Sequence, residues 1–234
     1  MTESCRMYDD PGFFSRSRAL SLSTVVLLAA LSLRAGTCLA QEPAGSTSAP
    51  AGRVLHFPKD RSVGLVKIQG IDVPEPTGGT WPSRMYTKGW EFVAEARGDV
   101  RIPPNRRVGL EMNRGVWRRP SDLRELRPND LYMLQSADID DRAGPTDWSM
   151  AQVGEFTGLR ILHLNSGTIT HRGLRNLTGL TRLKELRISS KRLGNPGLAV
   201  LAKMNSLERL SVTGKRISDA GLAYLSKMKS LQRE

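Results

Sequence analysis

Cysteine, histidine and aromatic residues are scarce in this chain of 234 residues. It has two cysteines, three histidines and 6% aromatic residues. Both cysteines, Cys5 and Cys38, precede the signal-peptide cleavage position derived below, so the mature chain is expected to have neither a disulfide nor a thiol. The histidines, His56, His163 and His171, are not spaced as metal ligands, and there is no nucleophile elbow, zinc-protease helix or phosphate loop. These absences argue against an enzyme, and we expect no metal, no cofactor and no small-molecule substrate.

A repeat of 24 residues dominates the C-terminal third of the chain. The string LxxLxL starts at Leu159 and starts again in phase at Leu183 and Leu207, with Ile or Val in the last place of the later copies. A fixed period of this length is typical of a solenoid, whose units bury their apolar faces only against neighbouring units. The other columns in phase are Ile169, Leu193 and Ile217; Gly173, Gly197 and Gly221; Leu174, Leu198 and Leu222; Leu177, Leu201 and Leu225; and Leu180, Met204 and Met228.

The pattern within one unit predicts a strand followed by a short helix. The alternation at the end of the leucine string is typical of a strand in which every second side chain faces the core. Asn195 and Asp219, in the same column as His171, are predicted to cap helix N-termini, and Pro196 follows where its missing N–H is tolerated. Leucines spaced by three predict the inner face of the helix, and the glycine column predicts close approach between units. The predicted fold class is therefore α/β, a solenoid of short parallel strands and helices.

These residues resemble a known family. The string LxxLxLxxxxxIxxxGLxxLxxL, read from Leu207 to Met228 with ISDAGL in its middle, is similar to the leucine-rich repeat. The closest subtype is the F-box or ribonuclease-inhibitor-like repeat, also found in many secreted bacterial proteins. The resemblance covers residues 157–234. It implies a curved solenoid with parallel strands on its concave face, and a role in binding other macromolecules rather than in catalysis.

The repeats are predicted to extend upstream, over residues 129–234 in all. Residues 129–156 are expected to form an atypical first repeat with an insertion, because Tyr132 and Leu134 fall in strand positions and Met150 lies 24 residues before a helix leucine. Terminal repeats often deviate from the consensus because they cap the stack. The alternative is that this segment is a plain linker.

The last repeat is predicted to be truncated. Leu231 opens a further unit in phase, but Glu234 stands where an apolar residue belongs. Either the chain is shorter than its relatives, or this end packs against something. An uncapped end exposes apolar side chains and a strand edge, so self-association is one expected consequence.

Residues 1–40 are predicted to be a secretory signal peptide. Arg16 and Arg18 precede an uncharged and mostly aliphatic run over Ala19–Leu33, and small residues then lead to Ala40. We expect cleavage near Ala40 and a secreted, periplasmic or cell-envelope protein. A retained membrane anchor and a lipoprotein cleaved before the second cysteine are the alternatives.

The segment between the signal and the repeats is predicted to contain a linker and a small domain. Residues 41–52 are rich in small residues and proline, which is typical of a flexible linker. Residues 53–120 are expected to form a small β-rich domain, with one strand over Val63–Ile68. Alternation over Val100–Ile102 and Val108–Met112 predicts a hairpin with a longer loop.

Aromatic residues are concentrated in this small domain. Trp81, Trp90 and Trp117 are expected in its core rather than in a ligand cage, and Trp90–Ala96 is predicted to be a short helix. The phrases LHFPKD and EARGDVRIP resemble a domain that precedes the repeats in some secreted bacterial proteins. A hydrolase site within residues 53–120 is kept as an alternative, although no constellation of residues marks it.

Positive charge is concentrated in the repeats. Residues 41–156 carry 16 basic and 16 acidic residues, whereas residues 157–234 carry 15 basic and 4 acidic residues, a net of +11. The period places basic residues of successive units over one another. This favours an anion-binding surface, although an ordinary solvated surface explains the same residues. The candidate partner-binding residues are His163, Arg187, Lys191, Arg192, Lys215 and Arg216.

The sequence therefore predicts a secreted, non-catalytic repeat protein that binds another macromolecule, in the first place a protein. The alternative partner is an acidic polymer, such as a polysaccharide of the cell envelope. Tyr224 is the only aromatic residue among the regular repeats, so stacking on the bases of single-stranded nucleic acid has little support.

Overall fold

A computed structural model describes residues 52–72, 89–137 and 144–231. The predicted signal peptide, the predicted linker up to residue 51, Trp81 and Glu234 lie outside the described residues. Within the described residues, no helix combines the length and the apolar character that crossing a membrane requires.

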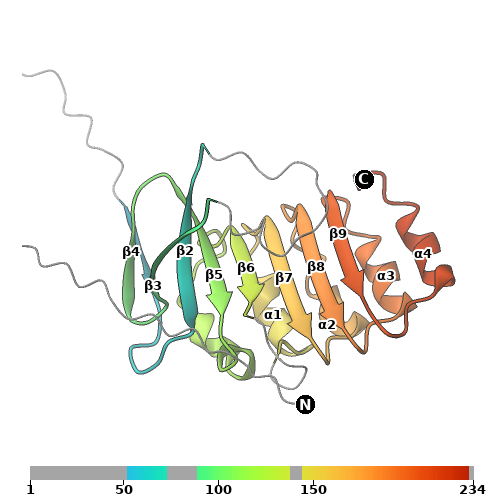
Figure 1. Cartoon of the computed structure of the whole chain (residues 1–234), viewed down its shortest axis with the longest axis horizontal. Helices are drawn as coiled ribbons and strands as arrows, with labels where there is room; N and C mark the ends of the chain where they lie inside the picture. The colour runs from blue at the N-terminus through green and yellow to red at the C-terminus, as the bar shows by residue number, and fades with distance from the viewer. Residues whose placement is uncertain (1–51, 73–88, 138–143, 232–234) are drawn as a thin grey trace, which may run out of the picture. The chain divides into compact units, whose positions relative to one another are not determined.

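The fold is mixed α/β, with a seven-stranded sheet and few helices (Figure 1). The three N-terminal strands of the sheet are joined by antiparallel pairing, β3 to β2 and β2 to β5, and every later pairing is parallel. A separate antiparallel pair is formed by β1 (Arg53–His56) and β4 (Asp99–Ile102). In spatial order, the strands of the sheet are β3 (Glu91–Glu95), β2 (Gly64–Gly70), β5 (Arg106–Met112), β6 (Met133–Ser136), β7 (Ile161–Ser166), β8 (Glu185–Ser190) and β9 (Arg209–Thr213).

The parallel strands pair in the register that the 24-residue period predicts. Leu162 pairs with Leu186, and Leu186 pairs with Leu210. Upstream the predicted register is wrong by two residues, because Leu134 rather than Tyr132 pairs with Leu162. The insertion that precedes β7 therefore shifts the strand and the helix of this segment by different amounts.

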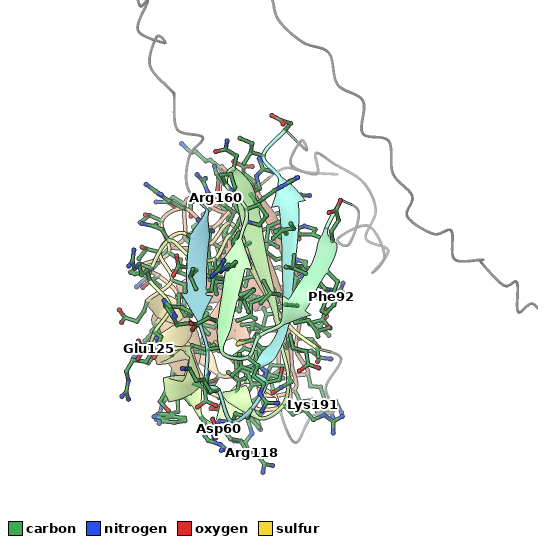
Figure 2. The ribbon with its side chains drawn as sticks, turned by 90° about the vertical axis from the view of Figure 1, so that its left-hand side faces the viewer. Asp60, Phe92, Arg118, Glu125, Arg160 and Lys191 are labelled. Atoms are coloured by element: carbon green, nitrogen blue, oxygen red, sulfur yellow. The ribbon has the colours of Figure 1, made fainter. Side chains whose placement is uncertain are left out.

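A short helix follows each of the last four strands, and these helices lie on one face of the sheet (Figure 1). Leu162 and Leu164 of β7 are buried on this face, whereas the intervening His163 points to the opposite face, which we call the open face. In Figure 2, the labelled Phe92 lies on the side away from Glu125, which belongs to the helical side. The helices are α1 (Ser149–Gly154), α2 (His171–Arg175), α3 (Asn195–Leu201) and α4 (Asp219–Leu225), and two 3-10 helices, η2 (Val116–Arg118) and η3 (Pro120–Leu123), precede β6.

The repeat columns form the core between the sheet and the helices. Leu186, Leu174 and Leu201 are fully buried. At the last unit the burial fails, because Leu222 of α4 is 51% exposed although Leu174 and Leu198 of the same column are buried. Among the described residues, β9 and α4 have a neighbouring unit on one side only.

The glycine column allows close approach between units, as predicted. A Cβ atom on Gly173 would lie 2.4 Å from Oδ1 and 2.9 Å from Cα of Asp147 in the preceding unit. A Cβ atom on Gly221 would lie 2.2 Å from Oδ1 of Asn195. A side chain at Gly173 would therefore press on the backbone of the preceding unit, whereas one at Gly221 would displace the Asn195 side chain.

The predicted capping role of Asn195 and Asp219 is wrong by one position. The N-cap residues are Thr170, Gly194 and Ser218, so the column residues open the helices instead. The Asn195 side chain bonds to the next unit: its Oδ1 accepts from the Ser218 backbone N–H at 3.0 Å. Asn195 therefore connects two units instead of capping the N-terminus of its own helix.

The N-terminal region keeps its predicted strands but not their pairing. A strand forms at β2, and Val100–Ile102 and Val108–Met112 lie within β4 and β5. However, β4 pairs with β1, and β5 pairs with β2 and β6, so the predicted hairpin is wrong. The predicted helix over Trp90–Ala96 is also wrong, because its residues form β3 on the edge of β2.

Residues 53–120 and the repeats contribute to one sheet. Strand β5 is hydrogen-bonded in parallel to β6, and Trp117 is 2% exposed in the same apolar core that holds the repeat leucines. Residues 129–156 contain β6 and α1, and their assignment as an atypical first repeat remains a prediction. The division of the chain into two domains at residues 120–129 remains a prediction.

Candidate binding site

The structure divides the six predicted site residues between two surfaces. His163 in β7 and Arg187 in β8 are paired in register on the open face. Lys191 and Arg192 follow β8, and Lys215 and Arg216 follow β9, where all four are exposed. The two groups have different surroundings, which determine what each can bind.

The open face carries a network of paired charges. Glu185 of β8 is fully buried, with its Oε1 2.5 Å from Nε2 of His163. Nε and a terminal nitrogen of Arg209 each lie 2.9 Å from Oε2 of the same carboxylate. A buried carboxylate is tolerated because cationic and polar partners replace its hydration shell. His163 therefore contributes to this network rather than offering a free group to a partner.

A second set of charges lies further along the same face. Glu111 of β5 accepts a hydrogen bond from Nε2 of Gln135 at 2.7 Å and forms an ion pair with Lys67. Lys184 and Glu208, 24 residues apart, form another pair near the starts of β8 and β9. These pairs were not predicted from the sequence, although their spacing is regular there: Glu185 and Arg209, like Lys184 and Glu208, are separated by one repeat.

On the other side, the loops that lead into the helices enclose a basic groove of about 550 Å³. Its lining includes three arginines and one carboxylate, that of Asp147. Both oxygens of Asp147 are already engaged, because the backbone N–H and the hydroxyl of Thr170 donate to them at 2.7 and 2.6 Å. We call this the arginine groove, and its lining residues are Asp147, Thr170, His171, Arg172, Arg192 and Arg216.

The arginines of the arginine groove outnumber its one carboxylate by three to one. Within the part of the chain that the structure describes, the side chains of Arg172, Arg192 and Arg216 form no ion pair or hydrogen bond. Arg216 is held close to the preceding unit by its backbone, which bridges Gly194 in parallel. Like charges that line one groove repel one another unless solvent or a bound anion compensates them.

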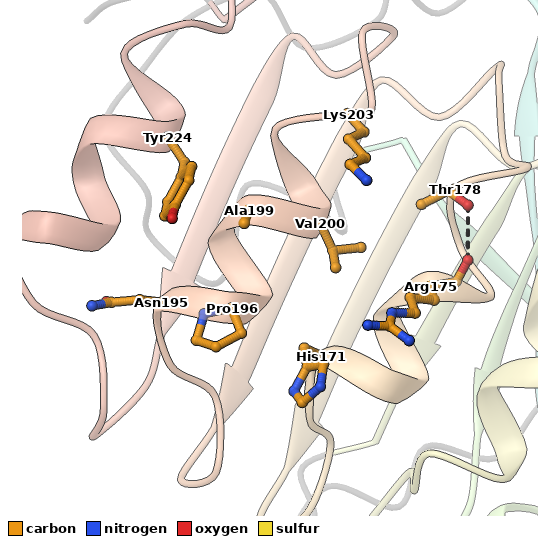
Figure 3. A pocket seen from close by; sticks show the side chains of 9 residues that line it. All are labelled: His171, Arg175, Thr178, Asn195, Pro196, Ala199, Val200, Lys203 and Tyr224. Carbon is orange, nitrogen blue, oxygen red and sulfur yellow. Dashed lines mark hydrogen bonds between the residues drawn. The ribbon is translucent and has the colours of Figure 1, made fainter.

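A second groove, of about 610 Å³, lies across the outer side of the helices (Figure 3). Arg175 of α2 and Lys203 beyond α3 supply its charge. Pro196, which is exposed, and the ring of Tyr224, which is 42% exposed, supply apolar surface. We call this the mixed groove, and its lining residues are His171, Arg175, Thr178, Asn195, Pro196, Ala199, Val200, Lys203 and Tyr224.

His171 lines both grooves. Asp147 and Asn195 hold the same repeat position and bond to the helix start of the next unit. His171 makes no such bond to Gly194, and its ring has no hydrogen-bond partner among the described residues. From the sequence, this histidine was predicted only to lie in the helix-cap column, and its position between two grooves was not predicted.

The pKa values that are clearly shifted belong to groups outside both grooves. A hydrogen bond from His56 lowers the pKa of the exposed Asp99, where β1 pairs with β4. A hydrogen bond to Asp122 raises the pKa of Arg61. Neither pair has a geometric connection to the candidate site.

Among the described residues, no three or more histidines, cysteines or carboxylates are grouped so that they could hold a metal ion. The two grooves offer cationic, aromatic and apolar groups to a ligand. Comparisons of the chain with protein-family models, curated proteins and solved structures gave no match.

Proposed function

We propose that this protein is a secreted, non-catalytic binding protein of the leucine-rich-repeat type, and that its partner is another protein. The repeat period and the strand register support the family assignment together. Residues 24 positions apart pair directly in β7, β8 and β9, and the glycines of one column approach the preceding unit closely.

We further propose that the units stack as a solenoid. The parallel pairing runs from β5 to β9, and each helix packs beside the helix of the adjacent unit. Each unit would then bury its apolar columns only against its neighbours, as repeat proteins do. An open mixed sheet has the same strand order, and a longer series of units would distinguish the two by its curvature.

The observation that carries the binding role is the unpaired positive charge on the loop side. The charges of the open face are largely neutralised by internal partners, whereas Arg192 and Arg216 form no ion pair with another described residue and share their groove with one carboxylate, that of Asp147. A surface of this kind attracts acidic partners and accelerates their association. We therefore propose a partner with an acidic face.

A polyanion is the second candidate, favoured by the net charge of +11 over residues 157–234. An acidic polysaccharide of the cell envelope would meet this charge after export. Export itself is a proposal, which mass spectrometry of secreted material tests. We expect a mature N-terminus at Gln41, and an intact N-terminus in the membrane fraction would contradict it.

Capture experiments at two salt concentrations test the binding role. Mature protein would be immobilised and exposed to a cell-envelope extract, alongside the variants K215E/R216E and R118E/R119E. Both pairs are exposed and carry the same charge, but only the first belongs to the repeats. We expect capture of a protein that is lost in K215E/R216E, is retained in R118E/R119E and weakens with salt. Absence of any captured macromolecule would contradict the proposed function.

Self-association is a further candidate interaction, at the β9 edge. Leu222 is half exposed there, and β9 is paired on one side only within the described residues. Sedimentation velocity over a range of concentrations tests it. An increase in sedimentation coefficient that L222K abolishes would support self-association, and a constant monomer value would contradict it.

A further inference from the structure

His171 lines both the arginine groove and the mixed groove, so the two grooves are adjacent. This adjacency supports a more specific proposal about the ligand than binding of an acidic partner. We infer that the two grooves together bind one extended acidic peptide segment of the partner. Its carboxylates would contact the arginine groove, and an apolar side chain would contact the mixed groove. The inference rests on the proposed function, since it specifies the part of the partner that is recognised.

The chemistry of the arginine groove selects carboxylates. Arg172, Arg192 and Arg216 present planar guanidinium groups, which bind carboxylates through two parallel hydrogen bonds. Asp147, whose two oxygens accept hydrogen bonds from Thr170, supplies one negative charge against the three positive charges of the groove. An incoming carboxylate would therefore supply the charge that this end of the groove lacks.

The chemistry of the mixed groove selects an apolar side chain. Pro196, Ala199 and Val200 of α3 line it together with the ring of Tyr224 from α4 (Figure 3). Arg175 and Lys203 flank this surface, so a neighbouring acidic residue of the ligand is also accommodated. Both volumes, about 550 and 610 Å³, fall within the range of about 300–1,000 Å³ that is usual for ligand pockets.

A peptide explains both grooves better than a polysaccharide does. An acidic polysaccharide supplies carboxylates but no aliphatic side chain. Among the described residues that line the two grooves, Tyr224 and His171 are the rings on which a sugar could stack. His171, whose ring is unbonded among the described residues, stands where the peptide would cross between the grooves. A neutral imidazole offers one donor and one acceptor, which suits a peptide backbone.

Fluorescence anisotropy with defined peptides tests this inference on the mature protein. The first probe is a labelled peptide of four glutamates followed by leucine, serine, phenylalanine and serine. In the second probe, serine replaces leucine and phenylalanine, and in the third, glutamine replaces glutamate. Polygalacturonate is the fourth probe. We expect the first peptide to bind at least about tenfold more tightly than the third, since each carboxylate–guanidinium pair is worth about a factor of ten.

Two pairs of charge reversals provide the matched comparison. R192E/R216E changes the groove, and K191E/K215E changes the adjacent, exposed residues of the same loops by the same charge. We expect R192E/R216E to weaken the first peptide about tenfold or more and K191E/K215E to weaken it less than about threefold. Y224A should weaken the first peptide and leave the second unchanged.

Three results would overturn the inference. Equal losses in both double variants would mean that net charge alone attracts the peptide. Binding of polygalacturonate but not of the first peptide would assign the grooves to a polysaccharide. Capture of a natural protein partner that R192E/R216E does not affect would place the interface elsewhere, while leaving the proposed function intact.

Discussion

The open face and the loop side of this sheet contain similar kinds of charged residues in different settings. On the open face, His163 and Arg209 surround the fully buried Glu185. On the loop side, Arg192 and Arg216 share a groove without a free carboxylate. A count of basic residues cannot distinguish the two surfaces, because burial and pairing decide which charges stabilise the fold and which are available to a ligand.

The largest effect should come from the core that both surfaces share. Leu186 is fully buried and Arg182 is exposed in the same unit. We expect Leu186→Ala to lower the free energy of unfolding by about 2–5 kcal/mol, because it leaves a cavity. Arg182→Ala should change it by less than about 0.5 kcal/mol. Urea denaturation measures both, and equal midpoints would contradict the predicted inward register.

The next effect should come from the buried charges of the open face. Glu185→Gln removes the charge from a carboxylate that two side chains contact, and we expect a loss of about 2 kcal/mol. Glu208→Gln breaks the partly exposed pair with Lys184 and should cost less than about 1 kcal/mol. Thermal unfolding of the two variants makes the comparison. A cost for Glu208→Gln as large as that for Glu185→Gln would mean that burial does not distinguish these pairs.

A smaller effect should follow from the close approach between units. Gly173→Ala would place a Cβ atom 2.4 Å from Asp147 Oδ1, whereas a Cβ atom on Gly179 meets nothing within 4 Å. We expect the first change to cost on the order of 1 kcal/mol through displacement of the neighbouring unit. The second should be neutral or slightly stabilising, because it restricts the unfolded chain. Chemical denaturation of both variants measures these changes. An unchanged free energy of unfolding for Gly173→Ala would show that the units separate without strain.

The smallest effect on stability should come from the loop side. Arg192 and Arg216 are exposed and have no internal partners among the described residues, so R192E/R216E should change the free energy of unfolding by less than about 0.5 kcal/mol. A clear loss of stability, seen as a lower urea midpoint, would mean that these arginines support the fold instead.

Predictions from the sequence were confirmed where the 24-residue repeat limited how the strands could pair. The repeated leucines predicted both the core positions and the pairing of Leu162 with Leu186, because each unit must present the same face to its neighbour. The pairing of Glu185 with Arg209 has the same period. It was missed because it lies on the face that carries no apolar pattern.

Prediction failed where pairing was non-local or a segment was short. The partner of β4 is β1, which lies more than 40 residues away in the sequence, so alternation alone could not identify it. A run such as Glu91–Glu95 is too short to separate a strand from a helix by periodicity. The grooves could not be predicted either, because His171 and Arg216 belong to the first and third of three successive 24-residue units and line one groove only in the folded chain.

Capture of a partner by loop-side and open-face variants shows which of the two surfaces the partner recognises. Mature protein, R192E/R216E and the open-face variant Arg187→Glu would be exposed to the same envelope extract, after circular dichroism has shown that all three are folded. If the loop side binds the partner, we expect R192E/R216E to lose the captured protein and Arg187→Glu to retain it. Retention by R192E/R216E together with loss by Arg187→Glu would contradict it and assign recognition to the open face.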